Sequence, residues 1–160
     1  MSEKMKTNLQ IDRIDKNILK LLLDNARISF LNIARSCNVS GAAIHQRIQK
    51  LKEKKIINGY HCSLNPKSLG YYTCAFIGLQ INLTSTSSHE DIFNRIKEIP
   101  EIVECHHVTG KYSLLIKIYS KNNEHLKQLI IDKIQSIYEI TNTETFLSLE
   151  EGFTRHLPID

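Results

Sequence analysis

The sequence predicts an α+β protein with a helical N-terminal domain followed by a C-terminal domain of strands and helices. Up to about residue 60, apolar residues recur at spacings of three and four, which is the helical period. From Tyr71 onward, stretches of alternating apolar residues are interspersed with further helical stretches. The intervening "HCSLNPKSLG" carries turn residues and few apolar ones. We therefore expect a helical domain over 1–60, a connector over 61–70 and a second domain over 71–160.

Composition narrows the class of protein. The chain has 160 residues and a net charge of +4, and none of its apolar runs approaches the ~20 residues that span a bilayer. Its polar start, "MSEKMKTNLQ", does not resemble a secretion signal. Its four cysteines are widely spaced, which predicts buried reduced thiols rather than a zinc or redox motif. These features predict a cytoplasmic protein that does not associate with membranes.

The first domain reads as three helices. Asp12 and Asp15 suit the start of the first helix, where the helix dipole favours negative charge. Ser29 can cap the second helix, and Asn38 tolerates the left-handed conformation that a tight turn requires. Ser40 then caps a third helix near residues 40–52. A helix, a sharp turn and a second helix within this span are typical of a helix-turn-helix.

The third helix has an apolar stripe, formed by Ile44, Ile48 and Leu51, that predicts an inward face. Its other faces carry short, amide or cationic side chains, which suit base edges and phosphates in a major groove. The charge distribution agrees: residues 1–60 hold twelve Lys or Arg against five Asp or Glu, whereas residues 61–160 hold nine against twelve. A solvated surface helix is the alternative. The residues that we expect to contact double-stranded DNA are Ser40, Ala42, Ala43, His45, Gln46, Arg47 and Lys50.

The second domain begins with a strand in which Ala75, Ile77, Leu79, Ile81 and Leu83 alternate with more polar residues. A helix from Ser88 to Pro100, strands "IVECHHV" and "LLIKIYS" around a turn at Gly110, a helix after Asn122 or Asn123 and a last strand "TNTETFLSL" follow. This βαββαβ order predicts a ferredoxin-like fold. Two helices on one face leave the other uncovered, and apolar neighbours such as Phe76 and Ile77 predict that another subunit covers it.

The sequence contains no arrangement typical of catalysis, such as a glycine-rich phosphate loop or an activated nucleophile. Cys105 and His107 alternate along a strand and so share a face, but a metal ion needs further ligands from elsewhere. We therefore predict no catalytic residue, metal site or cofactor.

Three segments resemble the Lrp/AsnC family of feast/famine transcription regulators: "IDRIDKNILKLLLDNARIS", "VSGAAIHQRIQKLKEKKIINGY" and "ECHHVTGKYSLLIKI". The resemblance implies a sequence-specific DNA-binding regulator whose C-terminal domains form homodimers that often assemble into octamers. It places Gln46, Arg47 and Lys50 against DNA. It also implies a small-molecule effector, commonly an amino acid, bound at a loop of the C-terminal domain, here Val108, Thr109, Gly110, Lys111, Tyr112 and Ser113.

Two residues depart from the family pattern. Ser113 stands where many members have an Asp that pairs with an effector's ammonium group; a hydroxyl keeps a hydrogen bond but loses the charge, which puts amino-acid binding in question. Lys55 stands where a Gly usually follows the recognition helix. Because a left-handed residue costs Lys about 1 kcal/mol more than Gly, we expect this helix to run on or end in another turn.

Two alternative functions share this architecture. One is a ligand-independent architectural protein that binds DNA with little sequence preference, with which Ser113 is compatible. The other is an enzyme resembling the sirohaem decarboxylases, although a strongly basic helix-turn-helix face is not expected there. A low ratio of specific to non-specific DNA affinity would indicate the architectural protein. Soret absorption of the purified protein would indicate the enzyme.

Overall fold

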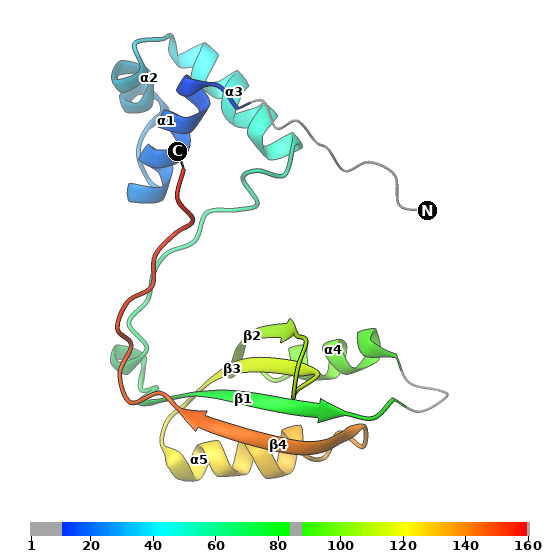
Figure 1. Ribbon diagram of the computed structural model, residues 1–160. Coiled ribbons are helices and arrows are strands. Elements are labelled where there is room, and N and C mark those ends of the chain that lie inside the picture. The colour runs from blue at the N-terminus through cyan, green and yellow to red at the C-terminus, as the bar shows by residue number, and fades with distance from the viewer. Residues whose placement is uncertain (1–10, 84–87, 160) are drawn as a thin grey trace, which may run out of the picture. The chain divides into compact units, whose positions relative to one another are not determined.

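The computed structural model describes residues 11–83 and 88–159. The polar first residues that argue against a secretion signal lie outside these ranges. The chain forms two compact units, a helical one up to Ser63 that also includes the C-terminal residues from Thr154, and a sheet unit over Leu64–Phe153 (Figure 1). The C-terminal residues therefore group with the helices, whereas the sequence led us to place them in the second domain. No described helix is long and apolar enough to cross a membrane.

The helical unit consists of α1 (Arg13–Asp24), α2 (Phe30–Cys37) and α3 (Gly41–Glu53). Asp12 caps α1 in a reciprocal capping box with Asp15, as the sequence suggested. Ser29 and Ser40 accept hydrogen bonds from the first-turn N–H groups of α2 and α3, both at 3.2 Å. The turn between α2 and α3 contains Asn38 in the left-handed conformation at φ 54°. The predicted helix-turn-helix is confirmed.

A small hydrophobic core holds the three helices together. Its fully buried members include Ile18 of α1, Ile33 of α2 and Ile44 of α3. Ile159 packs against this cluster and so ties the end of the chain to the unit. The core therefore draws on every helix and on the C-terminal segment.

The end of α3 differs from our expectation. Lys55 adopts the left-handed conformation at φ 54°, although we expected the helix to avoid it. The N–H of Ile56 donates to the carbonyl of Leu51, and that of Lys55 to Lys52, both at 2.9 Å, which is the Schellman pattern. Ile56 packs against the core at this point. The burial of Ile56 and the two hydrogen bonds outweigh the strain of a non-glycine residue.

The second unit is a four-stranded antiparallel sheet in the order β2-β3-β1-β4. Its strands are β1 (Thr73–Ile81), β2 (Ile102–His107), β3 (Leu114–Ser120) and β4 (Ile140–Leu147), and a 3₁₀ turn, η1 (Lys67–Leu69), precedes them. The first strand is shorter than expected: a register irregularity follows Gln80, and Leu83 lies exposed beyond the strand. With the two intervening helices, the sheet confirms the ferredoxin-like arrangement.

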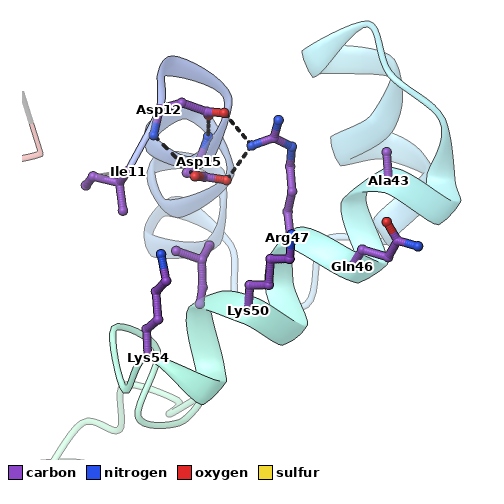
Figure 2. A pocket seen from close by; sticks show the side chains of 9 residues that line it. Ile11, Asp12, Asp15, Ala43, Gln46, Arg47, Lys50 and Lys54 are labelled. Atoms are coloured by element: carbon purple, nitrogen blue, oxygen red, sulfur yellow. Dashed lines mark hydrogen bonds and ion pairs between the residues drawn. The ribbon is translucent and has the colours of Figure 1, made fainter. Parts of the chain in front are cut away.

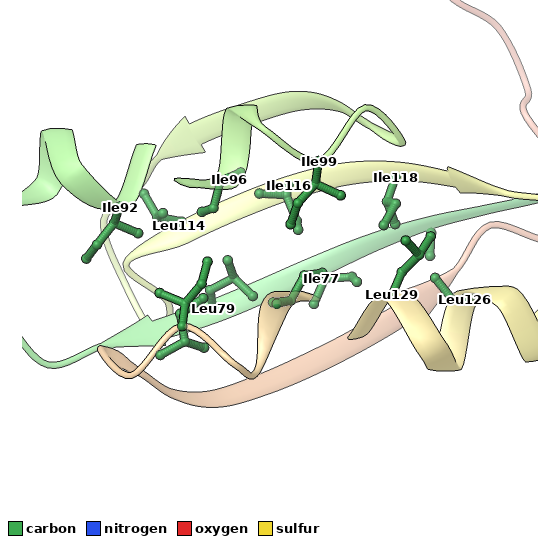
Figure 3. Close-up of a cluster of buried hydrophobic side chains, with 14 residues drawn as sticks. Ile77, Leu79, Ile92, Ile96, Ile99, Leu114, Ile116, Ile118, Leu126 and Leu129 are labelled. Carbon is green, nitrogen blue, oxygen red and sulfur yellow. The ribbon is translucent and has the colours of Figure 1, made fainter. Parts of the chain in front are cut away.

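Both helices of this unit pack on one face of the sheet (Figure 3). α4 (His89–Lys97) starts at a capping box of Ser88 and Asp91. α5 (Asn123–Gln128) is capped by Asn122 and continues as a π-helical turn, η2 (Leu129–Ile134). Their apolar side chains cover alternate residues of β1 and β3. The buried members shared by these elements are Ala75, Ile77, Leu79, Ile92, Ile96, Leu114, Ile116, Ile118, Leu126, Leu129 and Ile134.

The opposite face of the sheet carries apolar side chains that α4 and α5 do not cover. Phe76 of β1 lies beside Phe146 of β4, and these residues are 37% and 46% exposed. Lys117 of β3 lies over the ring of Phe76, with its ammonium 5.7 Å from the centroid. We call this surface the open face; the sequence predicted it to be uncovered.

The conformation of Lys55 allows a stability test. Lys55→Gly removes the cost of a left-handed non-glycine residue and should stabilise the helical unit by about 1 kcal/mol. Thermal unfolding should show a midpoint a few degrees higher. Lys54→Gly is the matched control, because Lys54 has φ −76° and gains nothing from glycine. An unchanged or lower midpoint for Lys55→Gly would show that the turn is not strained.

Candidate nucleic-acid and effector sites

The candidate DNA-contacting side chains lie on α3 and at its N-terminus. Ala42, His45, Gln46 and Lys50 are exposed, whereas Ala43 and Arg47 are partly buried. Ser40 is exposed but its hydroxyl already caps the helix. His45 makes an edge contact with Phe30 of α2, with ring centroids 6.0 Å apart. The helix therefore presents a polar surface of amide, imidazole and ammonium groups.

Arg47 reaches away from that surface to the start of α1 (Figure 2). Its Nη1 donates to Oδ2 of Asp12 at 2.6 Å and to Oδ1 of Asp15 at 2.8 Å. These are the two carboxylates of the α1 capping box, so the ion pairs join α3 to α1. The backbone hydrogen bond from Asp15 and the hydrogen bond from Arg47 together lower the pKa of Asp12. Arg47 thus has a structural role in the domain.

A hollow of about 430 Å³ lies between α1 and α3 beside these ion pairs. Lys50 on the last turn of α3 and Lys54 at its C-cap lie on the wall of the hollow, as Figure 2 shows. Gln46 and Ala43 line it from the N-terminal half of the same helix. Asp12 and Asp15 also line the hollow, but their charges are paired with Arg47, which leaves Lys50 and Lys54 as the cations that suit a phosphate group.

The candidate effector loop joins β2 to β3 and is held by hydrogen bonds. The N–H of Val108 donates to the carbonyl of Ser113 at 3.0 Å, and the N–H of Ser113 donates to Leu79 at 2.8 Å. Gly110 has φ 117°, a conformation that side chains disfavour. The hydroxyl of Ser113 accepts from the N–H of Ile81 at 3.3 Å and so supports the irregular end of β1.

Two loop residues make side-chain contacts on the open face. Lys111 and Tyr112 both contact the carboxylate of Glu144, which lies on β4. The ring of Tyr112 lies directly on Gly78 of β1, where a Cβ atom would come within 2.5 Å of it. The hydrogen-bonded ion pair between Lys111 and Glu144 lowers the pKa of Glu144 and raises the pKa of Lys111. The structure therefore joins the loop to two strands, while it records no such side-chain contact for exposed Thr109.

Cys105 and His107 do point to the same side of the sheet. Cys105 packs against the hydrophobic core, where burial raises the pKa of its thiol. His107 lies against His89 of α4, with ring centroids 4.5 Å apart. Within residues 11–83 and 88–159, His, Cys, Asp and Glu do not gather in threes or more as a metal site requires.

Sequence reasoning missed three partners in these sites. Asp12 and Asp15 were interpreted as helix-start residues, and their pairing with Arg47 depends on how α1 packs against α3. Glu144 lies more than thirty residues after the loop that it contacts. Its charge in an otherwise neutral strand, "TNTETFL", is the signal that could have singled it out.

Both units match known protein families. The AsnC-type helix-turn-helix domain matches residues 11–52, and the Lrp/AsnC ligand binding domain matches residues 74–156. Regulatory protein AsnC of Escherichia coli K12 is 36% identical over 148 residues, covering 92% of this chain and 96% of that protein. The chain belongs to the Lrp/AsnC family. HTH-type transcriptional regulator Ptr1 of Methanocaldococcus jannaschii is 37% identical over 139 residues, covering 87% and 92% of the two chains.

Solved structures of transcription regulators share the fold. The structure of E. coli AsnC has a TM-score of 0.83 at 34% identity and covers 92% of this chain and 97% of its own. The transcriptional regulator NMB0573 of Neisseria meningitidis has a TM-score of 0.86 at 22% identity, covering 94% and 97%. The resemblance noted in the sequence is therefore confirmed.

The ion pairs of Arg47 predict a loss of stability on substitution. Arg47→Met keeps most of the apolar stem but removes both ion pairs, and should lower the free energy of unfolding by about 1 kcal/mol, since the pairs are partly exposed. Because the pKa of Asp12 is lowered in the folded protein, this contribution is present above the ordinary carboxyl pKa and is lost as the pH falls through the lowered one.

Chemical denaturation across a pH series tests this assignment. The difference between wild type and Arg47→Met should be largest near neutral pH and should shrink below about pH 4. Exposed Arg35 of α2 provides the control substitution Arg35→Met. A stability difference that is the same for both variants, or that does not change in acid, would contradict the structural role of Arg47.

Proposed function

We propose that this member of the Lrp/AsnC family is a sequence-specific transcription regulator that binds double-stranded DNA in the cytoplasm through α3. The observation that carries the proposal is the exposed polar surface of the second helix of a helix-turn-helix, formed by Ala42, His45, Gln46 and Lys50. Amide and cationic side chains on such a helix can form base contacts in a major groove. The charge of +7 over residues 1–60 supports attraction to the DNA backbone.

Gln46 and Lys50 take separate roles in this proposal. Gln46 is exposed near the middle of α3 and suits the adenine edge, which an amide contacts with two hydrogen bonds. Lys50 and Lys54 line the hollow beside α1 and suit a phosphate. Arg47 is held at Asp12 and Asp15 by two ion pairs through Nη1, so in this proposal it mainly supports the position of α3, and its predicted contact with DNA stays a prediction.

We further propose that an amino acid bound at the loop 108–113 modulates DNA binding. In support of this proposal, the loop lies within residues 74–156, which match the Lrp/AsnC ligand binding domain. The Neisseria meningitidis regulator and a feast or famine regulatory protein of Mycobacterium tuberculosis, at 22% and 21% identity, were solved with L-methionine. The neutral Ser113 is compatible with this proposal because a carboxylate from elsewhere in the chain, that of Glu144, lies against the same loop.

The open face supports a homodimer, which we propose as the unit of a larger assembly such as an octamer. Phe76, Phe146 and Val103 expose 37%, 46% and 52% of their surfaces on or beside this sheet. A second copy that covers the face would remove these apolar groups from water. It would also cover the surface on which Tyr112 and Glu144 lie.

Selection of bound duplexes from a random pool at near-physiological salt tests DNA recognition. We expect one enriched, roughly palindromic site. On that site, Gln46→Ala should lose about 1 to 3 kcal/mol and relax preference at one position, whereas Lys50→Ala should weaken all duplexes alike and lower the salt slope by about 1. Exposed Lys133 of the sheet unit gives the control Lys133→Ala.

Each failure of this selection has a separate meaning. An enriched site with unchanged Gln46→Ala and Lys50→Ala affinities would contradict the assignment of α3. Binding without enrichment would contradict sequence-specific recognition and favour an architectural protein.

Phe146→Asp tests the dimer. The substitution places a charge among the apolar groups of the open face and should dissociate the dimer to monomers at micromolar concentration, as light scattering coupled to size exclusion would show. Exposed Tyr138 lies outside the sheet and gives the control Tyr138→Asp. An unchanged mass for Phe146→Asp would show that subunits meet elsewhere.

A further inference from the structure

The helical unit contains another, larger hollow on a different side of α1 from the ion pairs of Arg47. It has a volume of about 830 Å³ and lies between α1, the segment 56–61 that follows α3, and the end of the chain at 156–159. The chain end lies beside α1, where Ile159 packs against the core (Figure 1). All of these segments belong to one compact unit. The volume falls within the range of about 300–1,000 Å³ that is usual for small-molecule sites.

Most of the lining of this hollow is apolar. Leu19 and Leu22 of α1 line it from the hydrophobic core. Leu23 of α1 and Leu157 of the chain end also line it, and both are exposed to water. A ligand that covers these two side chains removes apolar surface from water, which favours binding. The hollow therefore suits a ligand with an apolar body.

The ionisable groups around this apolar lining favour an anion. Lys16, His61 and His156 line the hollow, and none of the described residues that line it is an Asp or a Glu. Within residues 11–83 and 88–159, these three side chains have no ion-pair or hydrogen-bond partner. An ammonium group and imidazole N–H groups all donate to a carboxylate, and such charge-assisted bonds are stronger than neutral ones. The lining is therefore complementary to one negative charge beside an apolar body.

We propose that this hollow binds an amphipathic carboxylate, a small molecule with one carboxylate and an apolar body. The carboxylate pairs with Lys16 and accepts hydrogen bonds from the imidazoles of His61 and His156. The apolar body lies against Leu23 and Leu157. The loop 108–113 and the open face belong to the sheet unit, so the proposed effector site and dimer do not use these residues.

The position of the hollow connects this ligand to the DNA-binding unit. Ile11, which precedes α1, lines both this hollow and the smaller one beside Lys50. Asp12 and Asp15 follow it and hold Arg47 of α3. A ligand that binds the folded unit but not the unfolded chain stabilises the folded form. The carboxylate therefore stabilises the same packing of helices that positions α3.

Calorimetric titration of the full-length protein with octanoate tests the proposal. Octan-1-ol is the matched probe that lacks the charge, and acetate is the probe that lacks the apolar body. We expect saturable binding of octanoate, binding of octan-1-ol that is weaker by about tenfold or more, and no measurable binding of acetate. Octanoate should also raise the midpoint of thermal unfolding of the helical unit, whereas acetate should not.

Variants assign the binding to this hollow. Lys16→Met keeps most of the apolar stem and should weaken octanoate by about tenfold or more while octan-1-ol binds as before. Exposed Lys20 lies one turn further along α1, outside the lining, and gives the control Lys20→Met. Ala26→Trp places a large ring at an exposed position in the lining and should abolish binding of both probes. Thermal unfolding verifies that the variants are folded, and His156→Leu replaces Lys16→Met if that variant is not.

The failures are distinguishable. If octanoate does not bind, or if folded Ala26→Trp binds it as wild type does, the hollow is not a carboxylate site and the proposal is wrong. If folded Lys16→Met and His156→Leu both bind octanoate unchanged, the basic lining does not recognise the carboxylate, which also overturns it. The duplex selection reports on DNA recognition independently of either result.

Discussion

The alternation of side chains along β1 is the constraint on which the sheet unit depends. Ala75, Ile77 and Leu79 point to the helices and pair across to Ile118, Ile116 and Leu114 of β3, so one face is buried. Phe76 and Gly78 point to the open face. A shift of one residue in register would exchange the two sets. The same alternation that builds the core therefore also places Gly78 beneath the ring of Tyr112.

The central position of β1 explains how the candidate effector site is assembled. β3 lies on one side of the strand and β4 on the other, so residues at the start of β3 and in β4 meet across it. Gly78 pairs with Glu144 in register. Because Gly78 has no side chain, the ring of Tyr112 can lie on it and reach Glu144. A loop residue and a strand residue that are distant in sequence thereby share one contact. The site depends on the sheet as much as on the loop.

Sequence patterns predicted the elements well and the contacts poorly. The caps Asp12, Ser29, Ser40 and Ser88 are local signals, because each binds a backbone group three residues away. The order of strands and helices along the chain followed from the change between strand-like and helix-like spacing of apolar residues. The left-handed Lys55 was predicted wrongly, since local propensity omits the packing of Ile56 against the core. The partners of Arg47 were missed for a related reason: they depend on how two helices pack.

The same chemistry, a cation paired with carboxylates, occurs at both candidate sites, and the two sites differ in how firmly the charges are anchored. At Arg47, two carboxylates share one guanidinium group, the Asp15 side chain is only 15% exposed, and the capping box fixes both acids. Separating these charges would also loosen the start of α1, so the pair holds structure and resists exchange. At Lys111, one carboxylate meets one ammonium group, and the Lys111 side chain is 61% exposed. Water can therefore solvate either charge when the pair opens. The two sets of ion pairs thus differ in anchoring and solvent access rather than in the groups that form them.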